Sequence, residues 1–170
     1  EAIKIATNKI NEFDKKYEKK WLKMMSNKIG LLDNEQEDEV LILDLLQWMH
    51  SNKADYTNTF CNLINEKIII DQIYNNEDFL NWKERWKTRL SKYKNKMDKV
   101  EEKMKFANPV IIPRNHKVEE ALNAAENGNM SLVEILLKVL EKPYENNSNL
   151  KEFQIQNKNN NNSYKTYCGT

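Results

Sequence analysis

The sequence predicts an all-α protein of about six helices that is irregular rather than a simple bundle. Apolar residues recur at three- and four-residue spacing through most of the chain, which is the period of a helix that buries one face. Only three glycines and three prolines occur in 170 residues. Two of these prolines, Pro109 and Pro113, lie close together and interrupt the helical pattern. We therefore expect an extended strap, bounded by prolines, between two helical regions.

Composition argues against several classes of partner. Lys and Arg number 27 against 26 Asp and Glu, so the net charge of +1 does not favour nucleic acid. Apolar runs stay shorter than the ~20 residues of a membrane span, and we see no signal peptide, so we expect no membrane partner. Two cysteines, Cys61 and Cys168, do not make a disulfide framework, which indicates the reducing cytoplasm.

Three segments are predicted along the chain. Residues 1–144 should form the helical C-terminal domain of a larger protein, because amphipathic helix begins at Glu1 itself. Residues 145–163 are rich in asparagine and cannot build a core, so we expect a flexible tether there. Residues 164–170 form a tail that contains Cys168.

The first helix is expected over residues 2–29. Its apolar stripe includes Trp and Met, which is typical of a buried core face. Gly30 should end the helix in the left-handed conformation. The stripe consists of Ile3, Ala6, Ile10, Phe13, Tyr17, Trp21, Met24 and Met25.

A second, central helix is expected around the apolar run 40–49, with Asp33 and Asn34 as available N-caps. Within it, Asp44 should lie on the less buried side or be paired. His50, near the end of this helix, is interpreted as a structural residue rather than a ligand. A loop over 53–60 should then lead into another helix, with Asp55 as its N-cap.

The next helical stretch is expected from Asn76, its N-cap, to Phe106, a length of about 45 Å if unbroken. Before it, the isoleucines at 68–70 and Ile73 read as strand or helix end, and we favour helix. Lysines on the outer face interleave with acids such as Glu84, which indicates a solvated face rather than a phosphate-binding one. The buried stripe is Phe79, Leu80, Trp82, Trp86, Leu90, Tyr93, Met97, Val100 and Met104.

The strap carries β-branched residues 110–112, which suit an extended segment on an apolar surface. Arg114, Asn115 and His116 then open a new helix, with Asn115 as a possible N-cap. We take these three residues as interface candidates that the strap directs at a partner, the alternative being an ordinary connector.

A pair of short helices should follow the strap. Gly128 is expected to end the first of them with a positive φ. Ser131 is predicted to cap the second, with Glu134 as its capping-box partner, and Pro143 to end it.

Local motifs for chemistry are scarce. The glycines lie far apart at 30, 128 and 169, so no glycine-rich phosphate loop occurs. Cysteine and histidine do not cluster at metal-ligand spacing, and no local motif pairs a nucleophile with a base, although spatial pairs stay open. We therefore predict no catalytic, cofactor-binding or metal-binding residue in this chain.

One pattern carries a family resemblance. The run Asn108-Pro109-x-x-Ile112-Pro113-Arg114-Asn115-His116-x-Val118-Glu119-x-Ala121-Leu122-x-x-Ala125-x-x-Gly128 resembles the C-terminal region of the selenoprotein O (YdiU/SelO-type) protein adenylyltransferases. Residues 53–60, 142–144 and 164–170 are similar to the family as well, and the likeness covers most of 29–170 in patches. The departures are Cys61 for the usual Arg, Asn129 for Asp and Tyr167 for Phe.

The resemblance implies a parent protein with a kinase-like fold that transfers AMP from ATP, with Mg or Mn, onto Ser, Thr or Tyr hydroxyls of proteins. The family's nucleotide- and metal-binding residues lie upstream, so none carries over to this chain. The resemblance thus implies a helical region that buttresses the missing N-terminal kinase-like domain in cis, or that binds protein substrates. The alternative is a free-standing helical protein-interaction module.

The resemblance also draws attention to Cys168, because vertebrate members place selenocysteine in this terminal region. We predict a redox-responsive contact between Cys168 and a cysteine in the missing catalytic part. The alternative is an inert terminal thiol.

Overall fold

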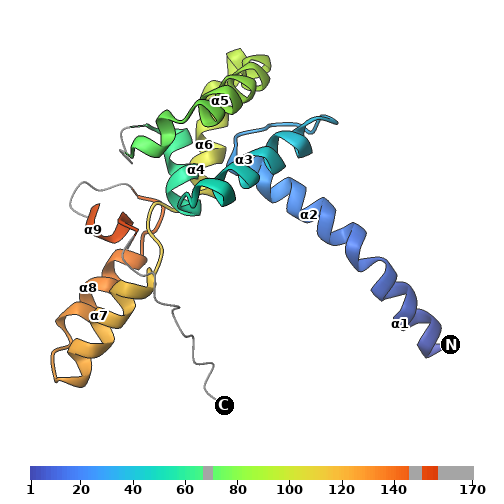
Figure 1. The fold of residues 1–170 in the computed structure, drawn as a ribbon. Coiled ribbons are helices and arrows are strands. Elements are labelled where there is room, and N and C mark those ends of the chain that lie inside the picture. Colours follow the sequence, from blue (N-terminus) through green and yellow to red (C-terminus); the bar gives the residue numbers. More distant parts are fainter. Residues whose placement is uncertain (67–70, 146–150, 157–170) are drawn as a thin grey trace. The chain divides into compact units, whose positions relative to one another are not determined.

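The computed structural model describes residues 1–66, 71–145 and 151–156 (Figure 1). Across these ranges the chain forms α-helices and two 3-10 helices, and strands are absent from them. The predicted all-α class is therefore confirmed. None of the helices in these ranges is long and apolar enough to cross a lipid bilayer.

The chain groups into two compact units, Glu1–Pro109 and Val110–Thr170. Unit 2 contains α7 (Asn115–Glu126), α8 (Ser131–Leu140) and the short α9 (Lys151–Gln154). Unit 1 contains α1 (Ala2–Asn11), α2 (Phe13–Lys28), α3 (Asp38–Asn52), α4 (Tyr56–Ile64), η1 (Gln72–Asn75), α5 (Glu77–Leu90), η2 (Ser91–Lys96) and α6 (Met97–Ala107).

Aromatic rings from three elements form the centre of unit 1. The ring of Phe79 on α5 lies 4.5 Å from that of Trp48 on α3 and 5.3 Å from that of Tyr74 on η1. Trp82 and Trp86 continue the same face of α5 with stacked rings 5.9 Å apart. Burying rings of this size supplies most of the apolar area of a small core. The stripe predicted for this helix therefore faces inward except at Leu80 and Met97, which are exposed.

The predicted helix 2–29 divides in two at Glu12, whose backbone stays in the right-handed helical region. Every residue of α1 is exposed, and so are Phe13 and Tyr17 of α2. Within this stripe Met25 is buried and Trp21 packs partly buried against the core, while Met24 is exposed. The prediction that the whole stripe is core was therefore wrong, because helical spacing defines a face and does not supply a partner for it.

Glycine and cap residues end and begin several helices as expected. Gly30 has φ +78 directly after α2. Asp55 accepts a hydrogen bond from the Asn58 N–H at 2.8 Å, and Asn76 accepts one from the Phe79 N–H at 3.3 Å. The caps proposed for α3 were wrong, since Glu37 occupies that N-cap and Asp33 is used elsewhere.

The long helix predicted to run to Phe106 is interrupted by η2. Tyr93 there has φ −103 and ψ 21, and Lys96 has φ −135 and ψ 24. The break brings the Tyr93 hydroxyl to the Asp33 carboxylate. The chain then continues as α6, which packs against α2. Ile73 lies in η1, while 67–70 fall outside the described residues.

The strap begins as predicted. Asn108 has φ −124 and ψ 98, so α6 ends before Pro109. In unit 2 the N–H groups of Val110 and Ile111 both donate to the Pro143 carbonyl, at 2.7 and 3.1 Å. The strap thus pairs with the chain that leaves α8.

Both cap predictions in unit 2 were wrong by one or two residues. Arg114 is the extended N-cap residue of α7, and its carbonyl accepts the first helical bond, from Val118 N at 3.0 Å, so Asn115 is already helical. At α8 the Asn129 side chain accepts from the Ser131 N–H at 3.0 Å. Gly128, with φ +82, ends α7 as expected.

A short helix, α9, lies inside the predicted tether 145–163, and its Phe153 is buried. Lys117 of α7 joins it, with its amine 3.6 Å from the Glu152 carboxylate and 6.0 Å from the centre of the Phe153 ring. The structure thus places a short helix, Lys151–Gln154, within the range predicted as a tether, and the division of the chain into domain, tether and tail stays a prediction. Residues 146–150 and 157–163 of that range, and the tail 164–170, lie outside the described residues.

Candidate functional site

The structure separates the three interface candidates by exposure. Arg114 is 9% exposed, Asn115 is exposed and His116 is half-buried. They follow one another at the start of α7, where consecutive side chains point in different directions. A role for these residues in partner contact stays a prediction.

Of the two cysteines, Cys61 lies within the described residues and Cys168 does not. Cys61 is fully buried in α4, and its thiol donates to the Pro109 carbonyl at 3.4 Å. Cys168, the redox candidate, lies outside the described residues. A buried, engaged thiol is a poor partner for exchange, so Cys61 is not suited to pair with Cys168.

A cluster of charged groups at the end of α5 is the most chemically capable arrangement that the structure shows. Arg89 donates to both oxygens of Asp38, from Nε at 2.7 Å and from Nη2 at 3.1 Å. The same guanidinium contacts Asp33 at 2.6 Å and Glu35 at 3.5 Å. Arg89 thus engages three carboxylates that could otherwise act as bases or ligands.

Electrostatic interactions in this cluster favour the charged form of the Asp33 carboxylate. Hydrogen bonds from Tyr93 and Arg89 hold the pKa of Asp33 below its usual value. Asp38 is 1% exposed and also accepts from the Glu35 N–H at 2.7 Å. Such a buried, fully engaged acid is suited to fix α3 and α5 together rather than to exchange protons with a substrate.

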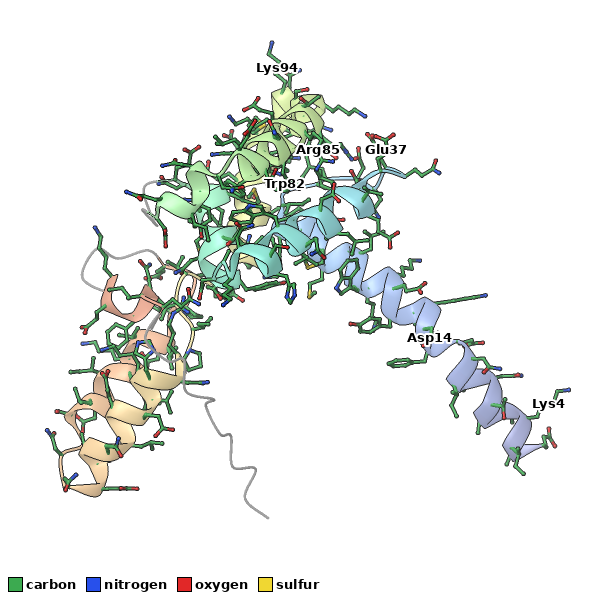
Figure 2. The ribbon with its side chains drawn as sticks, viewed as in Figure 1. Lys4, Asp14, Glu37, Trp82, Arg85 and Lys94 are labelled. Atoms are coloured by element: carbon green, nitrogen blue, oxygen red, sulfur yellow. The ribbon has the colours of Figure 1, made fainter. Side chains whose placement is uncertain are left out.

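A surface pocket of about 470 Å³ lies beside this cluster. Lys92, which lines it, is paired with Glu35 at 2.5 Å. Figure 2 shows the Lys94 side chain pointing away from the helices. The lining residues are Leu32, Asp33, Lys92, Tyr93, Lys94, Asn95 and Lys96.

Tryptophan side chains tie the helices of unit 1 to one another. The Trp82 indole on α5 donates to the Leu41 carbonyl on α3 at 2.8 Å (Figure 2). The Trp86 indole donates to the Ile29 carbonyl after α2 at 2.8 Å, and Trp48 donates to the Asn76 cap at 3.0 Å. The apolar period predicted these rings as core, but it gave no sign of their hydrogen-bond partners.

Asn108, the first residue of the family-like run, fastens the last helix of unit 1 to an early one. Its amide donates to the Lys28 carbonyl at 2.8 Å and to the Met104 carbonyl at 2.9 Å. The Lys28 amine in turn donates to the Ala107 carbonyl at 3.0 Å. Burial lowers the pKa of Lys28. Sequence reasoning missed this role, because it treated Asn108 only as the residue before a proline.

The resemblance implies ATP and Mg or Mn for the parent protein, which raises the question whether the described residues include side chains that could hold such a metal ion. In the described ranges, His, Cys, Asp and Glu do not gather in groups of three or more that could hold a metal ion. The three acids that do approach one another share a single guanidinium. We derive no catalytic step from this cluster.

Comparison with known proteins places the chain in a family. Residues 2–141 match the family described as protein adenylyltransferase SelO. The chain is 45% identical over 170 residues to a protein nucleotidyltransferase YdiU of Pelagibacter ubique, and 42% identical over 171 residues to one of Bacillus thuringiensis. In both comparisons all of this chain is covered, but it spans only 35% of the relative's length. The chain therefore belongs to the SelO protein adenylyltransferase family, as the run from Asn108 to Gly128 suggested.

Proposed function

We propose that these 170 residues are the non-catalytic helical part of a SelO-family protein nucleotidyltransferase. The rest of such a protein would bind ATP with Mg or Mn and transfer AMP to Ser, Thr or Tyr hydroxyls of protein substrates. This helical part would buttress that kinase-like portion in cis. The family match and the 35% coverage of longer relatives support the proposal.

One structural observation supports the buttress role. The buried polar groups of unit 1 bind other helices of the same unit, as the Trp82 and Trp86 indoles and the Arg89–Asp38 pair show. Hydrogen bonds of this kind fix the relative positions of helices, and a rigid element is what a neighbouring catalytic part can be built on.

Two measurements test this role. The full protein that carries these residues, supplied with labelled ATP and Mg or Mn, should label a protein substrate with AMP. The 170-residue chain alone should not, and AMP transfer by this chain would overturn the proposal. The remaining portion without these residues should lose solubility or activity, and retention of both activity and solubility would remove the buttress role.

The redox role of Cys168 is proposed as a regulatory addition to this function. Its thiol would form a disulfide with a cysteine in the rest of the protein, while two electrons and two protons pass to a disulfide oxidant such as oxidised glutathione. Peptide mass mapping of the oxidised full protein tests it. A disulfide that contains Cys168 is expected, and its absence under oxidising conditions would contradict the idea.

A further inference from the structure

The first two helices present an apolar face that the described part of unit 1 leaves uncovered. We name the exposed residues Ile3, Ile10, Phe13 and Tyr17 the N-terminal stripe. Their exposed fractions are 82%, 71%, 63% and 58%. The spacing of seven, three and four residues places them on one face of nearly continuous helix. Scattered apolar residues on a surface are ordinary, but a one-sided row of four is typical of an interaction surface.

The stripe continues directly into the core of unit 1. One turn beyond Tyr17, Trp21 is half-buried against the core, and Met25 and Ile29 are fully buried. The same face of the same helix is therefore packed at its C-terminal end and bare over its first part, which Figure 1 shows as a helical arm that leaves the other helices of unit 1. From Ile3 to Tyr17 the bare part is about 21 Å long.

The side chains of the stripe are arranged as a contact surface. The rings of Phe13 and Tyr17 stack with centroids 6.2 Å apart and planes 23° apart, so they form one flat apolar area. Lysines such as Lys4 and Lys15 lie on the other side of the helix at the helical spacing. A partner for this face should accordingly be apolar, with the lysine side left in water.

We propose that the N-terminal stripe docks onto an apolar surface in the remaining portion of the same SelO-family protein, an inference that rests on the proposed function. The relatives carry about two-thirds of their length outside the matched region, since this chain spans 35% of them. A surface in the same polypeptide competes at an effective concentration of about millimolar, far above that of a second copy of the chain. The occupant is thus a cis surface rather than a dimer partner.

Cysteine protection tests the proposal in the full protein that carries these residues. Ile10→Cys should react with a maleimide rapidly in the 170-residue chain and at least about tenfold more slowly in the full protein. The matched control is Leu80→Cys on α5, which is 44% exposed and should react at the same rate in both. Peptide mapping separates the adduct at position 10 from those of Cys61 and Cys168.

Three outcomes would overturn it. The first is equal labelling at position 10 in both proteins. The second is protection that appears in the 170-residue chain as its concentration rises, which would identify a second copy as the occupant. The third is a triple variant, Ile10→Gln with Phe13→Gln and Tyr17→Gln, that leaves the unfolding temperature of the full protein unchanged. We expect the triple variant to lower that temperature and to leave the 170-residue chain unaffected.

These results are distinguishable from failure of the proposed function. A stripe that is protected while removal of all 170 residues leaves AMP transfer and solubility intact would keep the docking surface and reject the buttress. A stripe that stays reactive while the removal abolishes transfer would reject the docking surface alone.

Discussion

Two apolar stripes in unit 1 share the same helical spacing and differ in what covers them. The stripe of α5, from Phe79 through Trp82 and Trp86, is buried and faces α3 and η1. The N-terminal stripe of α1 and α2 is exposed over its first part. The difference teaches that periodicity identifies the face that needs a partner, whereas the partner itself depends on which other segments are present.

The largest expected difference is between two phenylalanines of these stripes. Phe79→Ala should lower the free energy of unfolding of the 170-residue chain by about 3–5 kcal/mol, because it empties a site among three other rings. Phe13→Ala should change it by less than about 0.5 kcal/mol, since that ring is exposed. Urea unfolding of both variants measures the two changes in the free energy of unfolding. Equal losses would mean that the two stripes do not differ in packing.

A second pair extends the comparison to charged residues one turn apart on α5. Arg89→Met should cost about 3–5 kcal/mol, because it leaves the buried Asp38 carboxylate without its partner. Arg85→Met removes an exposed pair with Asp44 at 2.8 Å and should cost at most about 1 kcal/mol. Thermal unfolding of the two variants at pH 7 gives the ranking, and a reversed order would refute the importance of burial here.

Two glycines with nearly the same φ differ in how closely they are packed. One of them, Gly30, lies where the N-terminal helices meet the core. A Cβ on Gly30 would lie 2.6 Å from Val100 Cγ1 and 2.9 Å from Met104 Sδ, while a Cβ on Gly128 has no atom within 4 Å. Gly30→Ala should therefore cost about 2–4 kcal/mol, from left-handed strain and crowding together. Gly128→Ala should cost about 1–2 kcal/mol from strain alone. Urea midpoints that coincide would show that Gly30 is not close-packed.

The last prediction concerns pH and the aromatic core. Burial raises the pKa of Tyr74 to about 12 from its usual 10.0. Above pH 10 the unfolded chain loses this proton while the folded chain keeps it, so stability is complete below pH 10 and declines until about pH 12. The loss should reach about 2–3 kcal/mol. In Tyr74→Phe this part of the decline should disappear from stability measured against pH, and an unchanged profile would contradict the assignment.

Sequence reasoning succeeded where the determining interaction is local. The caps Asp55 and Asn76, the left-handed Gly30 and Gly128 and the extended Asn108 each depend on residues within one turn. The all-α class follows from the same short-range periodicity.

Prediction failed where distant residues decide the outcome. The break at η2 places Tyr93 beside Asp33, which is 60 residues away in the chain. Arg89 forms an ion pair with Asp33, which the local pattern predicted to be a helix cap. The two wrong caps in unit 2 show a further limit, because neighbouring polar residues such as Asn129 and Ser131 can exchange roles at little cost. The candidate site residues Arg114, Asn115, His116 and Cys168 came from the resemblance and from local placement, and their roles stay predictions.

The clasp between Asn108 and Lys28 also sets an order for chain synthesis, because it joins the end of unit 1 to α2. Its two ends are separated by 80 residues, so unit 1 cannot close while the ribosome is still translating α6. Until Asn108 emerges, the end of α2 lacks the hydrogen bond that the Asn108 amide donates to the Lys28 carbonyl. A nascent chain that stalls before the strap would consequently leave α2 and α6 without this connection.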